Sequence, residues 1–333
     1  MMRVELIIVA GVLFAASASA LGAATERPDA DALLLAALSA PTSGYVARGR
    51  IQSFSPGRKP KALGMIVYCL PNGRLRREVR TRPRFAPEQI YVGDGSQRSL
   101  YWPKLGTLWG AVMADEPAAE AAARLRSLYE VSVATGGRVA KHETWRLDLR
   151  APDGRLRRAL WVDRASGLVL KSEDYRLDGA LLRRERLTAL AEENPDPGFF
   201  RLEPPPGTRA ARMTAPRGPN DPDAVFPLWI PDGFLALASS VEGAGLSRTL
   251  AIGYGDGMRT FTLREAPGGA DFGPGGTTSR SVRLHGGARA ALVFGADGPL
   301  LEFRFRGRAY SITGEIAEDQ MIRVADSIAA ASP

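Results

Sequence analysis

Residues 160–190, LWVDRASGLVLKSEDYRLDGALLRRERLTAL, constrain the fold of this chain more than any other segment. The run contains three stretches of alternating side chains, joined by Ser166-Gly167 and Asp178-Gly179. Alternation on both sides of an Asp-Gly pair is the strongest short-range sign of an antiparallel hairpin. The segment therefore predicts three consecutive antiparallel strands with tight turns.

The same period of two continues on both sides of this segment, and three other stretches follow the helical period. Glycine and proline are frequent, with 36 and 24 residues, which suits a chain with many turns. Helices are predicted from Ala30 to near Pro41, at Ala118–Tyr129 and at Glu318–Ala330. Further strands are predicted at Gly44–Phe54, Ala62–Leu70, Leu75–Arg82, Gln89–Val92, Arg98–Trp102, Val131–Ala134, Glu143–Arg150, Leu235–Ser240, Thr249–Tyr254, Thr260–Arg264, Ser281–Leu284, Ala288–Phe294, Leu300–Arg306 and Arg308–Thr313.

The chain is long enough, at 333 residues, for two domains that each bury a core. A proline- and glycine-rich segment at 204–226 has the composition of a linker. We therefore expect a first domain at 25–203 and a second, smaller domain at 227–330, preceded by a separate segment at 1–24.

Residues 1–24 have the pattern of an export signal. Arg3 supplies a positive start, Leu6–Ala16 an apolar core and residues 18–20 (Ala-Ser-Ala) a cleavage site, with a second candidate cut after Ala24. An uncleaved membrane anchor is the alternative, although the apolar core is short for a bilayer span. The pattern predicts a soluble protein in the periplasm, exported by a cleavable signal peptide.

Charge and cysteine content narrow the classes of partner. The formal net charge is +8, and an exported protein with this excess suits anionic partners such as lipid headgroups or an acidic protein face, whereas nucleic acid is not expected in that compartment. Cys69 is the single cysteine, so no intramolecular disulfide can form, and its place in an apolar alternating run predicts a small buried side chain.

Known catalytic patterns are missing from the sequence. No Gly-x-Ser-x-Gly elbow occurs, and His142, His285 and Cys69 do not make a metal-ligand set. The glycines at 253–257 lack the Lys-Ser/Thr ending of a phosphate-binding loop. Paired carboxylates for glycoside hydrolysis remain an open alternative. We expect a protein that is not an enzyme and needs neither cofactor nor metal.

A cationic stripe is predicted on one strand. Arg74, Arg76, Arg80 and Arg82 share one parity, so a strand there would present them on a single face. Such a stripe is either a solvated sheet face or a contact for phosphates or an acidic partner, which arginine binds in a bidentate way.

Several aromatic residues are candidates for an apolar pocket. In a curved sheet wrapped around helices, Tyr91, Tyr101, Trp102 and Trp145 would line a cavity for an acyl chain. The alternative is that they are ordinary core residues. An acyl ligand would gain about 0.8 kcal/mol for each buried methylene group.

The order of these features resembles a known family. The export signal, the leading helix, the strand meander and LWVDRASGLVLKSEDYRLDG look like the lipoprotein-carrier fold shared by LolA and the sigma-E regulatory protein RseB (MucB) family. Downstream motifs are similar to the carboxyl-terminal domain of the RseB/MucB family, and simple LolA proteins lack that domain. These signature residues are Trp229, Pro231, Gly233, Phe234, Tyr254, Asp256, Gly257, Gly314 and Glu315.

The resemblance implies an α+β architecture. It comprises a LolA-like half-open antiparallel β-barrel that covers helices, followed by a smaller α+β domain. It also implies a periplasmic, non-enzymatic regulator of the sigma-E envelope stress response, which binds the periplasmic domain of an anti-sigma factor and senses lipid or lipoprotein signals. An acyl chain, a lipoprotein or a lipopolysaccharide would be the ligand. The alternative function is a periplasmic lipid or lipoprotein carrier similar to LolA.

Overall fold

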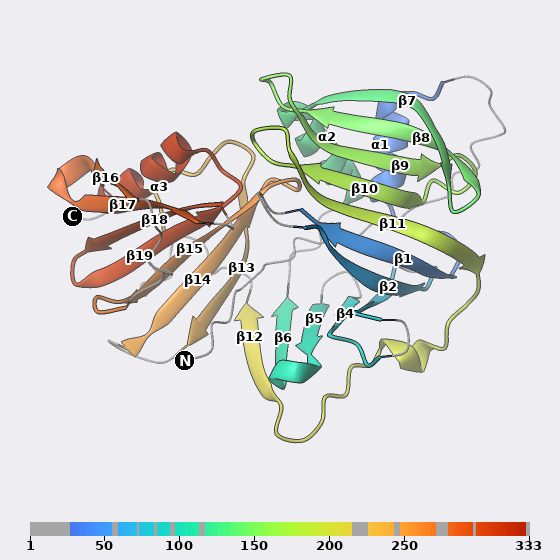
Figure 1. Ribbon diagram of the computed structural model, residues 1–333, viewed down its shortest axis with the longest axis horizontal. Coiled ribbons are helices and arrows are strands. Elements are labelled where there is room, and N and C mark those ends of the chain that lie inside the picture. Colours follow the sequence, from blue (N-terminus) through green and yellow to red (C-terminus); the bar gives the residue numbers. More distant parts are fainter. Residues whose placement is uncertain are drawn as a thin grey trace. The chain divides into compact units, whose positions relative to one another are not determined.

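The computed structural model describes residues 27–54, 59–71, 73–82, 85–93, 97–112, 117–214, 226–242, 247–270, 279–295 and 298–330. These residues fall into two compact units, one ending at Met213 and one beginning at Thr214 (Figure 1). The predicted signal peptide lies outside the described residues. Among the described residues, no helix is both long and apolar enough to cross a membrane.

The first unit is built on a long sheet of mostly antiparallel strands. Neighbouring strands pair in the order β7-β8-β9-β10-β11-β1-β2-β3-β4-β5-β6-β12, and the pair of β6 with β12 is parallel. The strands are β1 (Tyr45–Ser53), β2 (Lys61–Cys69), β3 (Leu75–Arg80), β4 (Gln89–Gly93), β5 (Gln97–Trp102), β6 (Thr107–Val112), β7 (Glu130–Val139), β8 (His142–Arg150), β9 (Leu156–Asp163), β10 (Val169–Tyr175), β11 (Leu181–Glu192) and β12 (Arg209–Thr214).

One face of this sheet, the inner face, is apolar. The register of neighbouring strands places Ala47, Val67, Leu147, Leu160 and Leu187 on it, and all five are buried. On β1, β3, β8, β10 and β11 the opposite, outer face carries charged residues at alternate positions, whereas Ile90, Val92 and Tyr101 form a buried apolar cluster on the outer face of β4 and β5. This alternation is the pattern of an antiparallel sheet with one covered and one solvated face.

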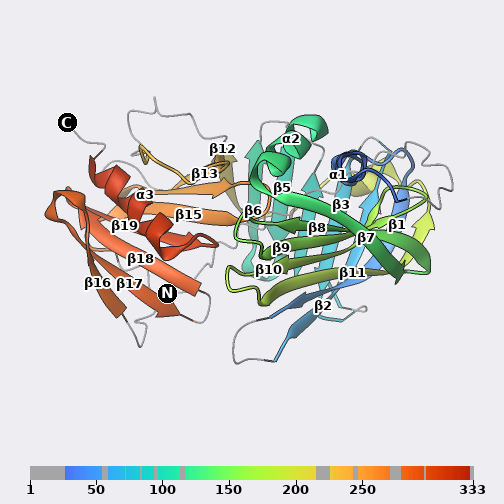
Figure 2. The ribbon, with the colours of Figure 1, turned by 90° about the horizontal axis from the view of Figure 1, so that it is seen from above.

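Helices α1 (Ala30–Leu38) and α2 (Ala118–Leu128) contact each other, and α1 also contacts β7 and β8 (Figure 2). Asp29 begins α1, since its side chain accepts a hydrogen bond from the backbone N–H of Ala32 at 3.1 Å. Leu33 and Leu34 are completely buried, so α1 is anchored by its apolar stripe.

The described residues of the second unit form a smaller antiparallel sheet and the helix α3 (Glu318–Ala330). Its strands pair in the order β13-β14-β15-β19-β18-β17-β16. Helix α3 contacts β18 and β19 and contributes Met321, Val324 and Ile328 to the core. The strands are β13 (Leu235–Glu242), β14 (Thr249–Gly255), β15 (Thr260–Pro267), β16 (Ser279–Arg283), β17 (Arg289–Gly295), β18 (Gly298–Phe305) and β19 (Arg308–Gly314).

The structure confirms the predicted α+β class, with a large antiparallel sheet bearing helices and a second, smaller α+β unit. It differs from the sequence expectation at two strands. Residues 209–214 form β12 inside the predicted linker, and β6 lies where no strand was expected. Strand β6 pairs with β5 on one side and with β12 on the other, so β12 is a strand that depends on a partner far away in the sequence. The exact domain boundaries stay a prediction.

Candidate functional site

The predicted cationic stripe on β3 is interrupted by a carboxylate. Glu78 lies between Arg76 and Arg80 on the outer face, 2.7 Å and 2.5 Å from their guanidinium nitrogens. Burial alone would raise the pKa of Glu78, but hydrogen bonds from Arg80 and Arg76 outweigh it and hold that pKa below its usual value. The three side chains therefore form a triad with one residual positive charge.

The other two predicted stripe residues are not free cations either. Arg82 lies over the ring of Phe85, with 5.6 Å from its guanidinium carbon to the ring centroid, and Arg74 also has a partner. Arg76 donates a hydrogen bond to the carbonyl of Phe199 at 2.9 Å. The structure thus brings the four arginines to one region, but it engages them within the protein. A ligand-binding role for them stays a prediction.

The same triad recurs on the outer face at two further places. On β8, Asp148 lies 2.6 Å from Arg146 and 3.4 Å from Arg150. On β10 and β11, the carboxylate of Glu173 contacts Lys171 and Arg184. Each carboxylate is shared by two cations, so each triad keeps one positive charge.

The aromatic residues proposed as one pocket do not all lie on the same face of the sheet. Tyr91 lies on the inner face, where Arg77 is 5.8 Å above its ring. Tyr101 lies on the opposite face, in a cluster with Ile90. The guanidinium carbon of Arg164 lies over the ring of Trp145, 3.8 Å from the ring centroid. The register thus separates Tyr101 from Tyr91, and an acyl pocket lined by Tyr91, Tyr101, Trp102 and Trp145 stays a prediction.

An ion-pair network that sequence reasoning missed lies on the inner face. Glu185 of β11 contacts Arg183 on its own strand and Arg77 of β3 at 3.5 Å, although β1 and β2 lie between those strands. Arg158 of β9 pairs with Asp174 of β10 on the same face. Nothing in the sequence links Arg77 to Glu185, since 108 residues separate them.

Glu185 is charged within this network. Burial alone would raise the pKa of Glu185, but the charges of Arg183 and Arg77, with the hydrogen bond from Arg183, outweigh it and hold that pKa below its usual value. The inner face therefore holds compensated charge, and the network fixes β3 against β11.

Groups with catalytic potential are not assembled in the described residues. No set of three His, Cys, Asp or Glu side chains there could hold a metal ion. His142 lies 3.5 Å from Asp163, and the carboxylate of Asp163 is already bound by Ser166 in the turn before β10. That arrangement stabilises a hairpin.

Cys69 has the buried position that its sequence pattern predicts, with 1% of its surface exposed. Burial raises the pKa of its thiol to about 11, so at pH 7 about one thiol in ten thousand is ionised. We expect iodoacetamide to leave the native protein unlabelled at pH 7 and to label it rapidly in urea, as followed by mass spectrometry. Equal labelling rates in both conditions would contradict this assignment.

The signature residues of the second unit build its core and turns. Tyr254 stacks on Phe261 at 4.7 Å between ring centroids, and Phe234 packs on the same ring at 5.4 Å. The guanidinium carbon of Arg323 on α3 lies over the ring of Trp229, 4.2 Å from the ring centroid. These aromatic contacts join the segment before β13 to the sheet and the helix.

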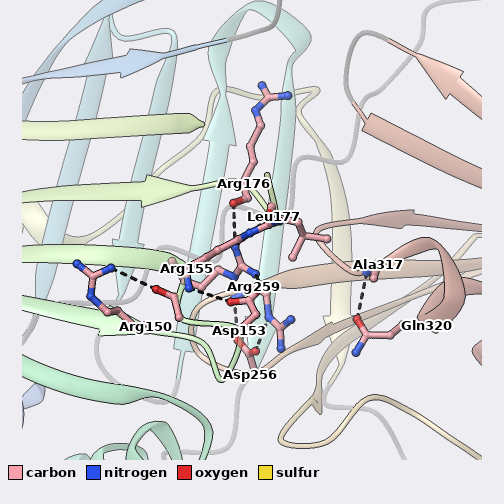
Figure 3. A network of polar contacts seen from close by, with 11 residues as sticks. Arg150, Asp153, Arg155, Arg176, Leu177, Asp256, Arg259, Ala317 and Gln320 are labelled. Carbon is pink, nitrogen blue, oxygen red and sulfur yellow. Dashed lines mark hydrogen bonds and ion pairs between the residues drawn. The ribbon is translucent and has the colours of Figure 1, made fainter. Parts of the chain in front are cut away.

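Asp256 fixes the turn between β14 and β15. Its buried carboxylate accepts hydrogen bonds from the backbone N–H groups of Met258 and Arg259, at 2.8 Å and 2.7 Å, and from the Arg259 side chain at 2.9 Å (Figure 3). Gly257 has a φ of +90°, which glycine adopts without strain. The Tyr-Gly-Asp-Gly motif therefore shapes the turn between β14 and β15.

The Gly314-Glu315 pair lies at the end of β19, just before α3. The backbone N–H of Glu315 donates to the carbonyl of Thr260 at 2.7 Å. The N–H of Ala317 then donates to the side-chain oxygen of Gln320 at 3.0 Å and so satisfies a donor at the start of α3 (Figure 3). A proline at 317 would lack that donor.

Exposed apolar side chains are concentrated near the start of the second unit. Of the six large hydrophobic residues exposed in the described chain, three lie within 228–241. Leu228 is 71% exposed, Leu235 50% and Val241 52%. Exposed apolar residues close together in the sequence are candidates for a protein contact.

Comparison with known proteins gives these features a family context. The model of the MucB/RseB N-terminal domain matches residues 104–206. Residues 104–206 are therefore similar to the MucB/RseB N-terminal domain family. This MucB/RseB segment contains α2, strands β6–β11 and the hairpins with which the sequence prediction began. None of the curated proteins matches the chain in sequence.

Solved structures of MucB extend the likeness in fold beyond that segment. A structure of MucB in complex with MucA(peri) matches with a TM-score of 0.53 and 19% identity, over 86% of this chain and 92% of that chain. The MucA/MucB complex of Pseudomonas aeruginosa matches with a TM-score of 0.55 and 18% identity, over 90% and 98%. The fold similarity thus covers both units.

Proposed function

We propose that this protein is a non-enzymatic regulator that binds the periplasmic domain of a membrane anti-sigma factor. The observation that carries the proposal is the fold match to MucB crystallised with MucA(peri), which extends over 86% of this chain. The MucB/RseB segment at 104–206 supports the same assignment. In this role the protein acts in the periplasm and links sigma-E regulation to envelope stress.

The exposed leucine and valine residues of the second unit are the candidate contact for that partner. Protein interfaces bury apolar anchors that are surrounded by polar residues. Leu228, Leu235 and Val241 are solvent-accessible in the free chain, so a partner could cover them without unfolding the unit. We assign the anti-sigma contact to this part of the second unit.

The test is capture of the anti-sigma factor's periplasmic domain on the immobilised protein. Leu235→Asp is expected to weaken binding about 30-fold, since it places a charge at an apolar anchor. The matched control is Leu35→Asp on α1, at a residue 40% exposed in the first unit, which should bind normally. Failure of the wild-type chain to capture any such domain would refute the proposed function, whereas an equal effect of both variants would refute the contact surface alone.

The signal to which the regulator responds is proposed to be a lipid or lipoprotein. The alternative of a dedicated lipid carrier is less well supported, since Arg77, Glu185 and Arg158 carry charge on the inner face where an acyl chain would lie. Extraction of the purified protein and mass spectrometry of the extract distinguish the two, because a carrier retains a stoichiometric acyl ligand.

A further inference from the structure

The outer face of the first unit carries a row of cations, and neither the fold nor the proposed function uses the two at its centre. Strand register places five basic residues side by side across the sheet, with Trp161 and Gly64 as the intervening positions. We call them the cationic row. They are Arg146 on β8, Lys171 on β10, Arg186 on β11, Arg50 on β1 and Arg80 on β3.

The middle of the cationic row has no internal counter-charge. Arg146, Lys171 and Arg80 each belong to a triad with a carboxylate, but Arg50 and Arg186 pair with no acidic side chain among the described residues, and both are exposed. The two arginines are directly opposite each other on β1 and β11. Like charges in such a pair destabilise a sheet, so folding alone does not account for them.

The surroundings of the pair are also positive. Arg48, exposed on the same face of β1, forms no ion pair with the described residues, and each flanking triad keeps one positive charge. The row runs over seven adjacent strands, or about 29 Å at the usual strand spacing. An extended anionic surface matches this geometry better than a single phosphate does.

Two exposed phenylalanines accompany these cations. Phe199 is 47% exposed and packs on two outer-face residues. Its ring centroid lies 5.1 Å from the ring centroid of Tyr68 and 5.5 Å from the guanidinium carbon of Arg76. Phe85 is 54% exposed beside Arg82, and its carbonyl accepts a hydrogen bond from Arg80. Basic side chains with neighbouring exposed aromatic rings are typical of surfaces that bind lipid headgroups.

We propose that the outer face of the first unit binds an anionic phospholipid surface. Guanidinium groups fit phosphate in a bidentate way, which suits Arg48, Arg50 and Arg186. A stable protein partner fits less well, because the cores of protein interfaces are depleted in charged residues and this face is charged at alternate positions on β1, β3, β8, β10 and β11. The proposal stands independently of the anti-sigma contact, which was placed on the second unit.

The first test is flotation of the purified protein with vesicles. We expect binding to phosphatidylglycerol–phosphatidylethanolamine vesicles, no binding to phosphatidylcholine vesicles, and release at about 1 M salt, where the screening length falls to about 3 Å. Inorganic phosphate should not compete. Equal binding to neutral vesicles, competition by inorganic phosphate, or tighter binding to polyglutamate than to vesicles would each overturn the proposal.

The second test removes the central pair. The double variant Arg50→Gln/Arg186→Gln should partition about 30-fold more weakly onto the anionic vesicles, since each basic residue near such a surface contributes about a factor of five. The matched control is Arg283→Gln/Arg289→Gln, which removes another exposed cross-strand arginine pair, between β16 and β17 of the second unit. Equal loss in both double variants would overturn the assignment to this face.

Folding of the variant is checked by its thermal transition. Removal of a like-charge pair should leave the transition unchanged or raise it slightly. If the double variant fails to fold, the single variant Arg50→Gln and the salt dependence of the wild-type protein decide the question. Weak salt dependence of wild-type binding would then count against the proposal.

Discussion

Replacing Gly314 by alanine is expected to lower the free energy of unfolding of the second unit by about 3 to 5 kcal/mol, combining backbone strain and overpacking. Gly314 has a φ of +142°, which side chains with a Cβ rarely adopt. A Cβ there would lie 2.4 Å from the carbonyl oxygen of Thr260 and 2.5 Å from the Cα of Phe261. Both are backbone atoms of β15, so no side-chain rotation relieves the overlap.

The matched control for this prediction is Gly307→Ala in the same unit. Gly307 also has a positive φ, +74°, but a Cβ there would meet nothing within 4 Å. Its replacement should therefore cost strain alone, about 1 kcal/mol. Urea unfolding followed by tryptophan fluorescence measures both variants. Equal losses would mean that close packing against β15 is not the reason for glycine at 314.

The sequence predicts the strands that have both a clear alternation and a marked turn, and it misses those that lack them. Period and turn chemistry located β10 and β11 within one or two residues, because Asp178-Gly179 marks the turn and the flanking residues alternate. Strand β6 was missed because Gly110 interrupts its short pattern, and β12 because its composition is that of a linker. Strand β12 finds its pairing partner in β6, about 100 residues earlier in the chain, and no local pattern can express such a contact.

The candidate sites also contain some features that are visible in the sequence and others that only the strand register shows. The arginine parity on β3 is visible in the sequence, and so is Glu78 at its centre, but the contact of Glu173 with Arg184 needs the register of β10 against β11. The cationic row is still more dependent on the fold, since Arg50 and Arg186 lie far apart along the chain. Tyr91 and Tyr101 lie on opposite faces of the sheet, which becomes visible only when the alternation is carried through the β4–β5 turn.

The second large effect on stability is expected when the ion-pair network of the inner face is broken. Glu185→Gln is expected to lower the free energy of unfolding by about 3 to 5 kcal/mol, since it leaves Arg77 and Arg183 without their shared anion on a covered face. Glutamine keeps the shape of the side chain, so the loss reports on charge. The control Glu192→Gln removes an exposed carboxylate from the same strand and should cost less than about 0.5 kcal/mol.

At low pH, wild type and Glu185→Gln are expected to have the same free energy of unfolding. The pKa of Glu185 is lower in the folded chain than in the unfolded one, so its contribution is fully present above the unfolded pKa, near 4.5, and is lost as the pH falls through the folded pKa. Glutamine does not titrate, and the two unfolding curves should therefore converge at low pH. A constant gap between them from pH 7 to acid would show that shape, and not charge, holds β3 against β11.

Removing Arg77 together with Glu185 separates the cost of leaving Arg77 unpaired from the worth of its ion pair, since Arg183 loses its anion in both variants. The double variant Arg77→Met/Glu185→Leu replaces the ion pair with apolar groups of similar size, and such replacements are often neutral or stabilising. We expect it to be more stable than Glu185→Gln by about 2 kcal/mol or more, which is a non-additivity that direct contact produces. If instead the double variant is the least stable, the pair itself fixes the curvature of the sheet, because Arg77 reaches from β3 over β2 and β1 to Glu185 on β11.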